Sequence, residues 1–199
     1  MQGDNTLTGE TPTGDLQAPV TARDHVQGPD TALVTMVEYA DYECPYSRIA
    51  YHVIKGVQRE LGGQLRFIYR NFPLREIHPH AQQAAEAAEA AASQDRFWEM
   101  HDYLFEHQRA LDDEHLHQYA AALGLEAEIF DQDLAQHRHA GKIEGDLRGG
   151  IRSDVQGTPT FFINGVRYEG SLDRNSLLSM IREAHALRGL TDPQGKDND

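Results

Sequence analysis

One short segment of this chain carries most of its information: Val37-Glu38-Tyr39-Ala40-Asp41-Tyr42-Glu43-Cys44-Pro45-Tyr46-Ser47. It lies where an apolar, β-branched run over residues 31–39 gives way to a helix that starts at Pro45. Cys44 is the only cysteine among the 199 residues. Its spacing to Ser47 is that of a C-x-x-C redox motif with serine in place of the second cysteine. The chain therefore has a thiol that can attack a disulfide and no second thiol to resolve the product.

The segments around this motif predict an α/β unit. A helix over 45–61 should end at the glycine pair 62–63, and residues 65–70 predict a second strand, so strand, helix and strand form a βαβ unit with parallel strands. Far downstream, strands over 160–163 and 166–169 flank Asn164-Gly165, a strong hairpin signal. A closing helix is predicted over 173–187.

The middle of the chain is helical without any strand signal. Helices are predicted over 81–93, 96–108, 112–123 and 126–136, and Phe97, Trp98 and Phe105 form a stripe that favours the core. We therefore expect an inserted all-helical subdomain over 79–149, between 25–78 and 150–188 of one α/β domain. Polar, Gly- and Pro-containing composition from residue 1 to about 30 predicts a flexible lead-in, which we end at residue 24, and 189–199 predicts a flexible tail.

Composition narrows the class of partner and the compartment. The formal net charge is −14 and no basic cluster is present, which argues against nucleic acid. No apolar stretch reaches the roughly 20 residues that span a bilayer. The start of the chain lacks the basic and apolar regions of a signal peptide, and one cysteine allows no internal disulfide. These features predict a cytoplasmic, bacterial-type protein with no membrane or nucleic-acid partner.

Several motifs together resemble the DsbA-like branch of the thioredoxin superfamily. The segment quoted above is followed by Gly157-Thr158-Pro159-Thr160-Phe161-Phe162-Ile163-Asn164-Gly165, with Arg70-Asn71-Phe72-Pro73-Leu74 and His78-Pro79-His80-Ala81 between them. The resemblance covers about residues 24–188. It implies an α/β thioredoxin fold with an inserted helical subdomain.

The resemblance also implies a role for five residues. Cys44 corresponds to the nucleophile at a helix N-terminus and Pro159 to a cis-proline that faces it, with Thr158 on the substrate side. Glu38 corresponds to a buried acid beneath the active-site helix. Ser47 takes the place of the resolving cysteine. No metal or tightly bound cofactor is implied, and glutathione is a candidate co-substrate.

The residues themselves support this chemistry and leave alternatives open. A helix N-terminus stabilises a thiolate, and the Ser47 hydroxyl can donate to the sulfur, whereas negative charge on Glu38, Asp41 and Glu43 opposes ionisation. We expect a moderately activated cysteine; the alternative is an inert buried thiol. A cis bond at Pro159 would let backbone groups of Thr158 pair with an extended substrate; the alternative is an ordinary proline at the start of a strand. Glu38 has either a functional or a residual structural role.

Other polar residues give weaker signals. Among three His-x-His pairs, His115/His117 and His137/His139 are poorly placed to bind a metal, because positions i and i+2 on a helix point to different sides, and a metal site is not favoured. The His78-Pro79-His80 segment either lines the cleft near Cys44 or starts the next helix. Arg70 and Arg75 either bind a carboxylate of a glutathione-like substrate or face solvent.

The leading hypothesis is a monothiol thiol–disulfide oxidoreductase. Cys44 would attack a disulfide-bonded or glutathionylated protein, or a small thiol substrate, and an external thiol would release it. The alternatives are a glutathione-dependent transferase or isomerase that uses Ser47, and a redox-silent module that binds extended peptides. A further alternative is that Ser47 is an engineered substitution.

Overall fold

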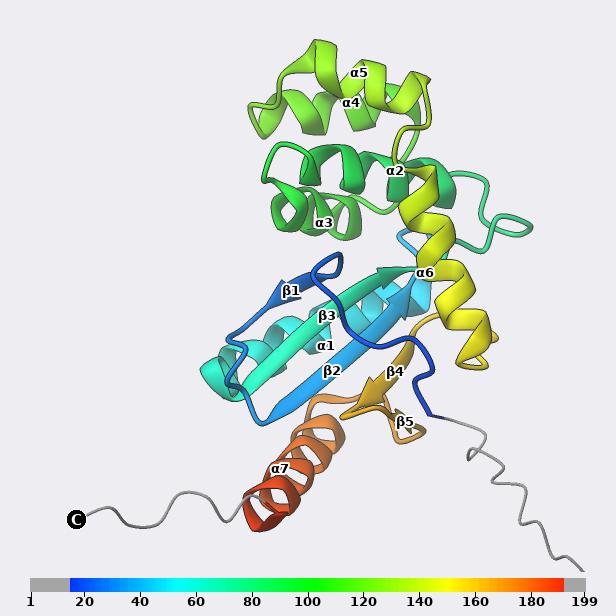
Figure 1. The fold of residues 1–199 in the computed structure, drawn as a ribbon. Coiled ribbons are helices and arrows are strands. Elements are labelled where there is room, and N and C mark those ends of the chain that lie inside the picture. Colours follow the sequence, from blue (N-terminus) through cyan, green and yellow to red (C-terminus); the bar gives the residue numbers. More distant parts are fainter. Residues whose placement is uncertain (1–14, 192–199) are drawn as a thin grey trace, which may run out of the picture.

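The computed structural model describes residues 15–191, and the predicted flexible ends at 1–14 and 192–199 lie outside this range. Its centre is a five-stranded sheet in the order β1-β3-β2-β4-β5 (Figure 1). The strands are β1 (His25–Gln27), β2 (Val34–Ala40), β3 (Leu65–Asn71), β4 (Thr160–Ile163) and β5 (Val166–Tyr168). β2 and β3 are parallel, with Val34 opposite Leu65, and the other neighbours pair antiparallel. The predicted βαβ unit and hairpin are confirmed.

Helix α1 (Pro45–Leu61) connects the two parallel strands. Pro45 occupies the first turn, where a missing N–H leaves no hydrogen bond unmade, and Gly62 ends the helix with a φ of 51°. Its apolar face, which includes Ala50, Ile54 and Val57, is buried against the sheet. The sequence pattern therefore gave both ends of this helix correctly.

The helices between β3 and β4 lie together beyond one end of the sheet, except that α6 runs back along one sheet face (Figure 1). They are α2 (Ala81–Ala92), α3 (Phe97–Glu106), α4 (Asp113–Ala122), α5 (Ala127–Ala135) and α6 (Ala140–Arg152). The aromatic stripe of α3 is core, as predicted, with Phe97 and Phe105 buried. The last helix is α7 (Arg174–Thr191), so residues 189–191, predicted as flexible tail, are helical instead.

Helix α6 had no clear boundaries in the sequence because four glycines weaken its helical pattern. Two of these glycines are explained by packing. A Cβ on Gly150 would lie 2.7 Å from the Phe72 ring, and one on Gly149 would lie 3.2 Å from the Tyr39 hydroxyl. Glycine lets α6 approach the sheet closely, and tertiary packing stabilises a helix that local propensity disfavours.

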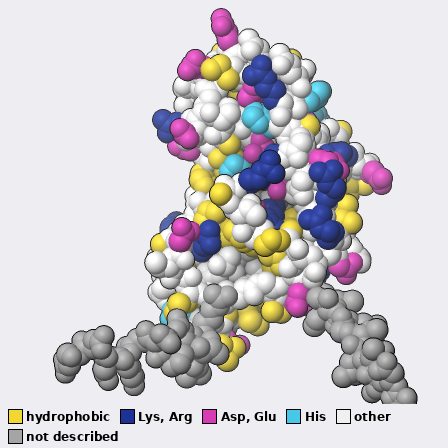
Figure 2. All heavy atoms as spheres, in the orientation of Figure 1, with side chains coloured by type: hydrophobic (Ala, Val, Ile, Leu, Met, Phe, Trp, Pro, Cys, Tyr) yellow, Lys and Arg dark blue, Asp and Glu magenta, His cyan; other side chains and the backbone are white. Residues whose placement is uncertain are grey.

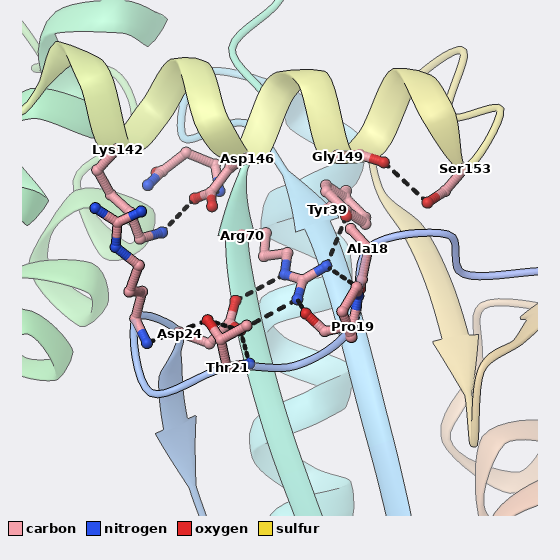
Figure 3. A network of polar contacts seen from close by, with 12 residues as sticks. Ala18, Pro19, Thr21, Asp24, Tyr39, Arg70, Lys142, Asp146, Gly149 and Ser153 are labelled. Atoms are coloured by element: carbon pink, nitrogen blue, oxygen red, sulfur yellow. Dashed lines mark hydrogen bonds and ion pairs between the residues drawn. The ribbon is translucent and has the colours of Figure 1, made fainter.

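The N-terminal segment corrects one expectation, because residues 15–30 are fixed to the sheet rather than flexible. Buried Arg70 on β3 donates through Nε to Asp24 at 2.7 Å and through Nη1 to the Ala18 carbonyl at 2.9 Å and the Tyr39 hydroxyl at 2.8 Å (Figure 3). Strand β1 follows and pairs with β3. Arg70 therefore neither binds substrate nor faces solvent. It anchors the start of the fold.

The described surface carries intermixed charges. On the face shown in Figure 2, basic side chains lie beside acidic ones. Arg75–Glu144 and Lys142–Asp146 are two of the ion pairs in the described part of the chain. Over residues 15–191, the structure has no helix with the length and apolar character that crossing a membrane requires.

Candidate active site around Cys44

The two motifs that stand far apart in the sequence meet at Cys44. Cys44 is the N-cap of α1, and its thiol donates to the backbone carbonyl of Thr158 at 3.3 Å. The side chain is only 4% exposed. The thiol thus lies at the positive end of a 17-residue helix and against the residue that precedes Pro159.

The Thr158–Pro159 peptide bond is cis. Beside it runs a groove of about 330 Å³, whose lining includes Tyr46 from α1, Thr160 and Tyr168 from the terminal hairpin, and Leu172. Tyr46 is 66% exposed, although it lies two residues after Cys44. An extended chain could therefore reach the neighbourhood of Thr158 along this groove.

The sequence suggested that the Ser47 hydroxyl donates to the Cys44 sulfur, but the structure gives this hydroxyl another partner. Its side chain is completely buried, and its hydroxyl oxygen accepts from the Asp41 backbone N–H at 3.4 Å. The hydrogen bond found for the Cys44 thiol runs to Thr158 instead. Ser47 thus holds the backbone just before α1, which is a structural contact.

Glu38 lies in the middle of the sheet, between Tyr69 of β3 and Phe161 of β4. It is 2% exposed, and its Oε1 has no hydrogen-bond partner among the residues that the structure describes. Burial raises the pKa of this carboxyl to about 8. Glu38 is therefore mostly neutral at pH 7, and it does not oppose a thiolate in the way that its formal charge predicted.

The loop of residues 41–44, here called the Cys44 loop, is bound by the His78-Pro79-His80 segment, which the sequence offered as one that lies near Cys44, and by Leu74, which it did not assign. The buried carboxylate of Asp41 accepts from the Leu74 N–H and from His78 Nδ1, both at 2.8 Å. The Glu43 carboxylate accepts from the backbone N–H of His80 at 2.6 Å. Each histidine of the His78-Pro79-His80 segment therefore contacts the Cys44 loop, and His80 also precedes α2 as its N-cap.

A third attachment comes from Gln108, just after α3. Its Nε2 donates to the carbonyls of Tyr42 at 2.7 Å and of Cys44 at 2.8 Å. No pattern near Gln108 in the sequence pointed to this role, because its partners lie 64 and 66 residues earlier. Only the packing of α3 brings them together.

The other polar candidates lie in unrelated contacts. Arg75 donates to Gln82 at 2.8 Å and pairs with Glu144, so its partners are surface residues of the helical region. Among residues 15–191, no three His, Cys, Asp or Glu side chains are grouped so that they could hold a metal ion.

Comparison with known proteins agrees with this geometry. Residues 20–183 match the protein-family model described as Thioredoxin. Among solved structures, BdbD from Bacillus subtilis superposes with a TM-score of 0.77 at 24% identity, covering 87% of this chain and 97% of its own. The α-DsbA1 protein of Wolbachia pipientis gives a TM-score of 0.73 at 21% identity, covering 88% and 97%.

Curated relatives are more similar in sequence but much longer. The chain is 44% identical over 186 residues to a protein of Salinispora tropica named Na(+)/H(+) antiporter NhaA 3, covering 93% of this chain and 28% of the relative. An NhaA 1 antiporter of Salinispora arenicola is 45% identical over 173 residues, covering 86% and 26%. The chain thus spans a little over a quarter of the length of these relatives. The matched family model, together with the shared architecture, shows that the chain belongs to the thioredoxin family and has the fold of the DsbA-type proteins.

Proposed function

We propose that this chain is a monothiol thiol–disulfide oxidoreductase in which Cys44 is the nucleophile. The observation that carries the proposal is the position of its sulfur, at the N-terminus of α1 and 3.3 Å from the Thr158 carbonyl. Backbone N–H groups of the first helical turn stabilise negative charge there. The adjacent groove offers an approach for a peptide substrate.

The reaction divides into two thiol–disulfide exchanges. The Cys44 thiolate attacks one sulfur of a protein–glutathione disulfide, which forms a Cys44–glutathione disulfide and releases the protein thiolate. A second glutathione thiolate then attacks the glutathione sulfur of that mixed disulfide. It yields glutathione disulfide and regenerates the Cys44 thiolate. An external thiol is required because Cys44 is the chain's only cysteine, and a reducing compartment such as the bacterial cytosol supplies one.

The environment of Ser47 argues against a transferase that activates glutathione through this hydroxyl. The side chain is completely buried and its oxygen already accepts a backbone hydrogen bond. A bound glutathione sulfur would have to reach an atom with no solvent access. Cys44 is therefore the better candidate for the reacting group.

The test is reduction of a glutathionylated peptide, followed with and without added glutathione. We expect turnover only with glutathione, no turnover by Cys44→Ser, and turnover within about threefold of the wild type for Ser47→Ala. If Cys44→Ser binds the peptide as well as the wild type and the wild type never turns over, the chain is a redox-silent binding module. Activity that survives Cys44→Ser would rule out the proposed nucleophile.

The relatives favour a second candidate function, that of an accessory domain for an ion antiporter. Proteins named Na(+)/H(+) antiporters contain a region 44–45% identical to most of this chain. Vesicles that hold the Salinispora tropica relative, with this region removed, provide the test. Sodium-driven proton exchange that changes when this chain is added supports the accessory role, and exchange that does not change argues against it.

A further inference from the structure

The Cys44 loop is held from outside the strand and helix that it connects. Asp41 is bound by Leu74 and His78, Glu43 by His80, and the carbonyls of residues 42 and 44 by Gln108. All of these partners come from the chain between β3 and α4. The region inserted between β3 and β4 therefore fixes the backbone that carries the thiol.

Of these partners, Gln108 is the one that contacts the backbone of Cys44 itself, and its geometry leaves one orientation of the amide. Both partners are backbone carbonyls, which only accept, so the NH₂ end of the side chain has to face them. The residue lies two positions after the end of α3, whose inward side chains Met100, Leu104 and Phe105 are almost completely buried. Its position is consequently set by the core and not by a mobile loop.

The backbone on both sides of Cys44 is fixed once Gln108 is bound. The Cys44 N–H donates to the Asp41 carbonyl at 3.1 Å, and the Cys44 carbonyl accepts from the Arg48 N–H at 3.2 Å as well as from Gln108. The bond from Arg48 belongs to α1 and does not depend on Gln108. Removal of the Gln108 amide thus leaves the helix start intact. It takes one hydrogen bond from the Tyr42 carbonyl and one from the Cys44 carbonyl, and the Cys44 carbonyl keeps its bond from Arg48.

We propose that Gln108 is a positioning residue for Cys44, which holds the thiol in its buried place against the Thr158 carbonyl. Where exchange at Cys44 is concerned, the role rests on the proposed function. Release of the loop has two opposite consequences. A small alkylating agent reaches the sulfur more often, because the thiol is only 4% exposed in the held position. Transfer from a peptide bound in the groove becomes slower, because the reacting sulfur spends less time in line with the substrate.

The test uses Gln108→Leu, which removes the amide at similar size and without a charge, and Gln118→Leu as the matched control. Gln118 lies on the exposed side of α4, and its amide donates to Glu114 of the same helix. We measure the rate at which iodoacetamide alkylates Cys44 in 0 to 2 M urea, below the unfolding midpoint. With two hydrogen bonds lost, we expect an increase of about tenfold for Gln108→Leu and none for the control.

The urea series separates local release from global unfolding. Opening of a short loop exposes little surface, so the faster rate should stay constant with urea, whereas global unfolding makes the rate climb steeply. For the glutathionylated peptide we expect Gln108→Leu to lower kcat and leave KM unchanged. A purely structural role would not produce that combination in the folded fraction.

Two results would overturn the proposal: an alkylation rate within twofold of the wild type, or a faster rate that climbs with urea as global unfolding does. Failure of the proposed function is recognised separately. If wild-type protein turns over no glutathionylated peptide while Gln108→Leu still shows the urea-independent increase in alkylation, the positioning role stands and the proposed reaction fails. If the leucine variant does not fold, Gln108→Glu takes its place in the test. Its carboxylate faces both carbonyls with acceptor atoms, so it should also raise the alkylation rate.

Discussion

Replacing Glu38 by Gln should remove a pH dependence of stability that one buried carboxyl creates. The side chain is 2% exposed and burial raises its pKa from 4.5 to about 8. Between these values the folded protein binds a proton that the unfolded chain releases. The stabilising contribution is therefore complete below pH 4.5 and is lost as the pH rises toward 8.

The size of the effect follows from the two pKa values. Each pH unit inside the window removes roughly 1.4 kcal/mol, so the wild type should lose about 3 kcal/mol between pH 4.5 and pH 7 through this group. A glutamine of the same shape has no proton to lose. The free energy of unfolding of Glu38→Gln, relative to the wild type, should therefore increase by about 3 kcal/mol over that range.

Urea unfolding at pH 5, 6 and 7 measures this difference, with fluorescence of the single tryptophan, Trp98, as the probe. Glu99→Gln is the matched control on the exposed side of α3. There Arg96 lowers the carboxyl pKa below 4.5, so the contribution of Glu99 changes only below that pH and the control should be nearly flat from pH 5 to pH 7. A difference between Glu38→Gln and the wild type that is flat within about 0.5 kcal/mol across the three pH values would refute the reasoning. Glu38 would then ionise as an ordinary carboxyl.

Three further predictions concern other parts of the molecule. Arg70→Leu leaves the Asp24 carboxylate buried without its cation and should lower the free energy of unfolding by about 3 kcal/mol. Arg174→Leu removes an exposed pair with Glu60 and should lower it by less than 1 kcal/mol. Urea unfolding of both variants checks this. Gly150→Ala should destabilise by about 1–3 kcal/mol, because the new Cβ would lie 2.7 Å from Phe72. The same change at exposed Gly145, where a Cβ would have no described atom within 4 Å, should be neutral or stabilising in thermal melts. Ser47→Cys restores a C-x-x-C motif and should make reduction of a disulfide peptide independent of glutathione in single-turnover assays; a continued need for external thiol would show that residue 47 cannot reach the mixed disulfide.

Local sequence patterns were sufficient for the framework of the fold. The β-branched run before Cys44, the proline that follows it and the Asn164-Gly165 turn each specify their own backbone conformation, so strands β2, β4 and β5 and helix α1 follow from a few neighbouring residues. The order of the two motifs, first at Cys44 and then at Thr158-Pro159, was also evident from the sequence. The buried position of Glu38 was also predictable, because an acid between apolar residues of an inner strand has no route to solvent.

The tertiary structure decided which polar groups are partners. Arg70 looked like a candidate ligand for a substrate carboxylate and instead fixes the N-terminal segment. Ser47 looked like a donor to the sulfur and instead accepts a hydrogen bond from Asp41. The glycines of α6, which weaken its helical pattern, are required by its close approach to Tyr39 and Phe72.

The physical reason is the range over which each kind of information acts. Backbone conformation and hydrophobic periodicity depend on neighbours within a few residues, so the sequence by itself determined most of the elements, their order and the place of the lone thiol. It did not determine strand β1 or the ends of α6. Hydrogen-bond partners of a buried loop are chosen by whatever the packing of distant helices brings within about 3 Å. Whether Cys44 is held by Ser47, Thr158 or Gln108 could therefore be decided only once α3 and β4 had packed around it.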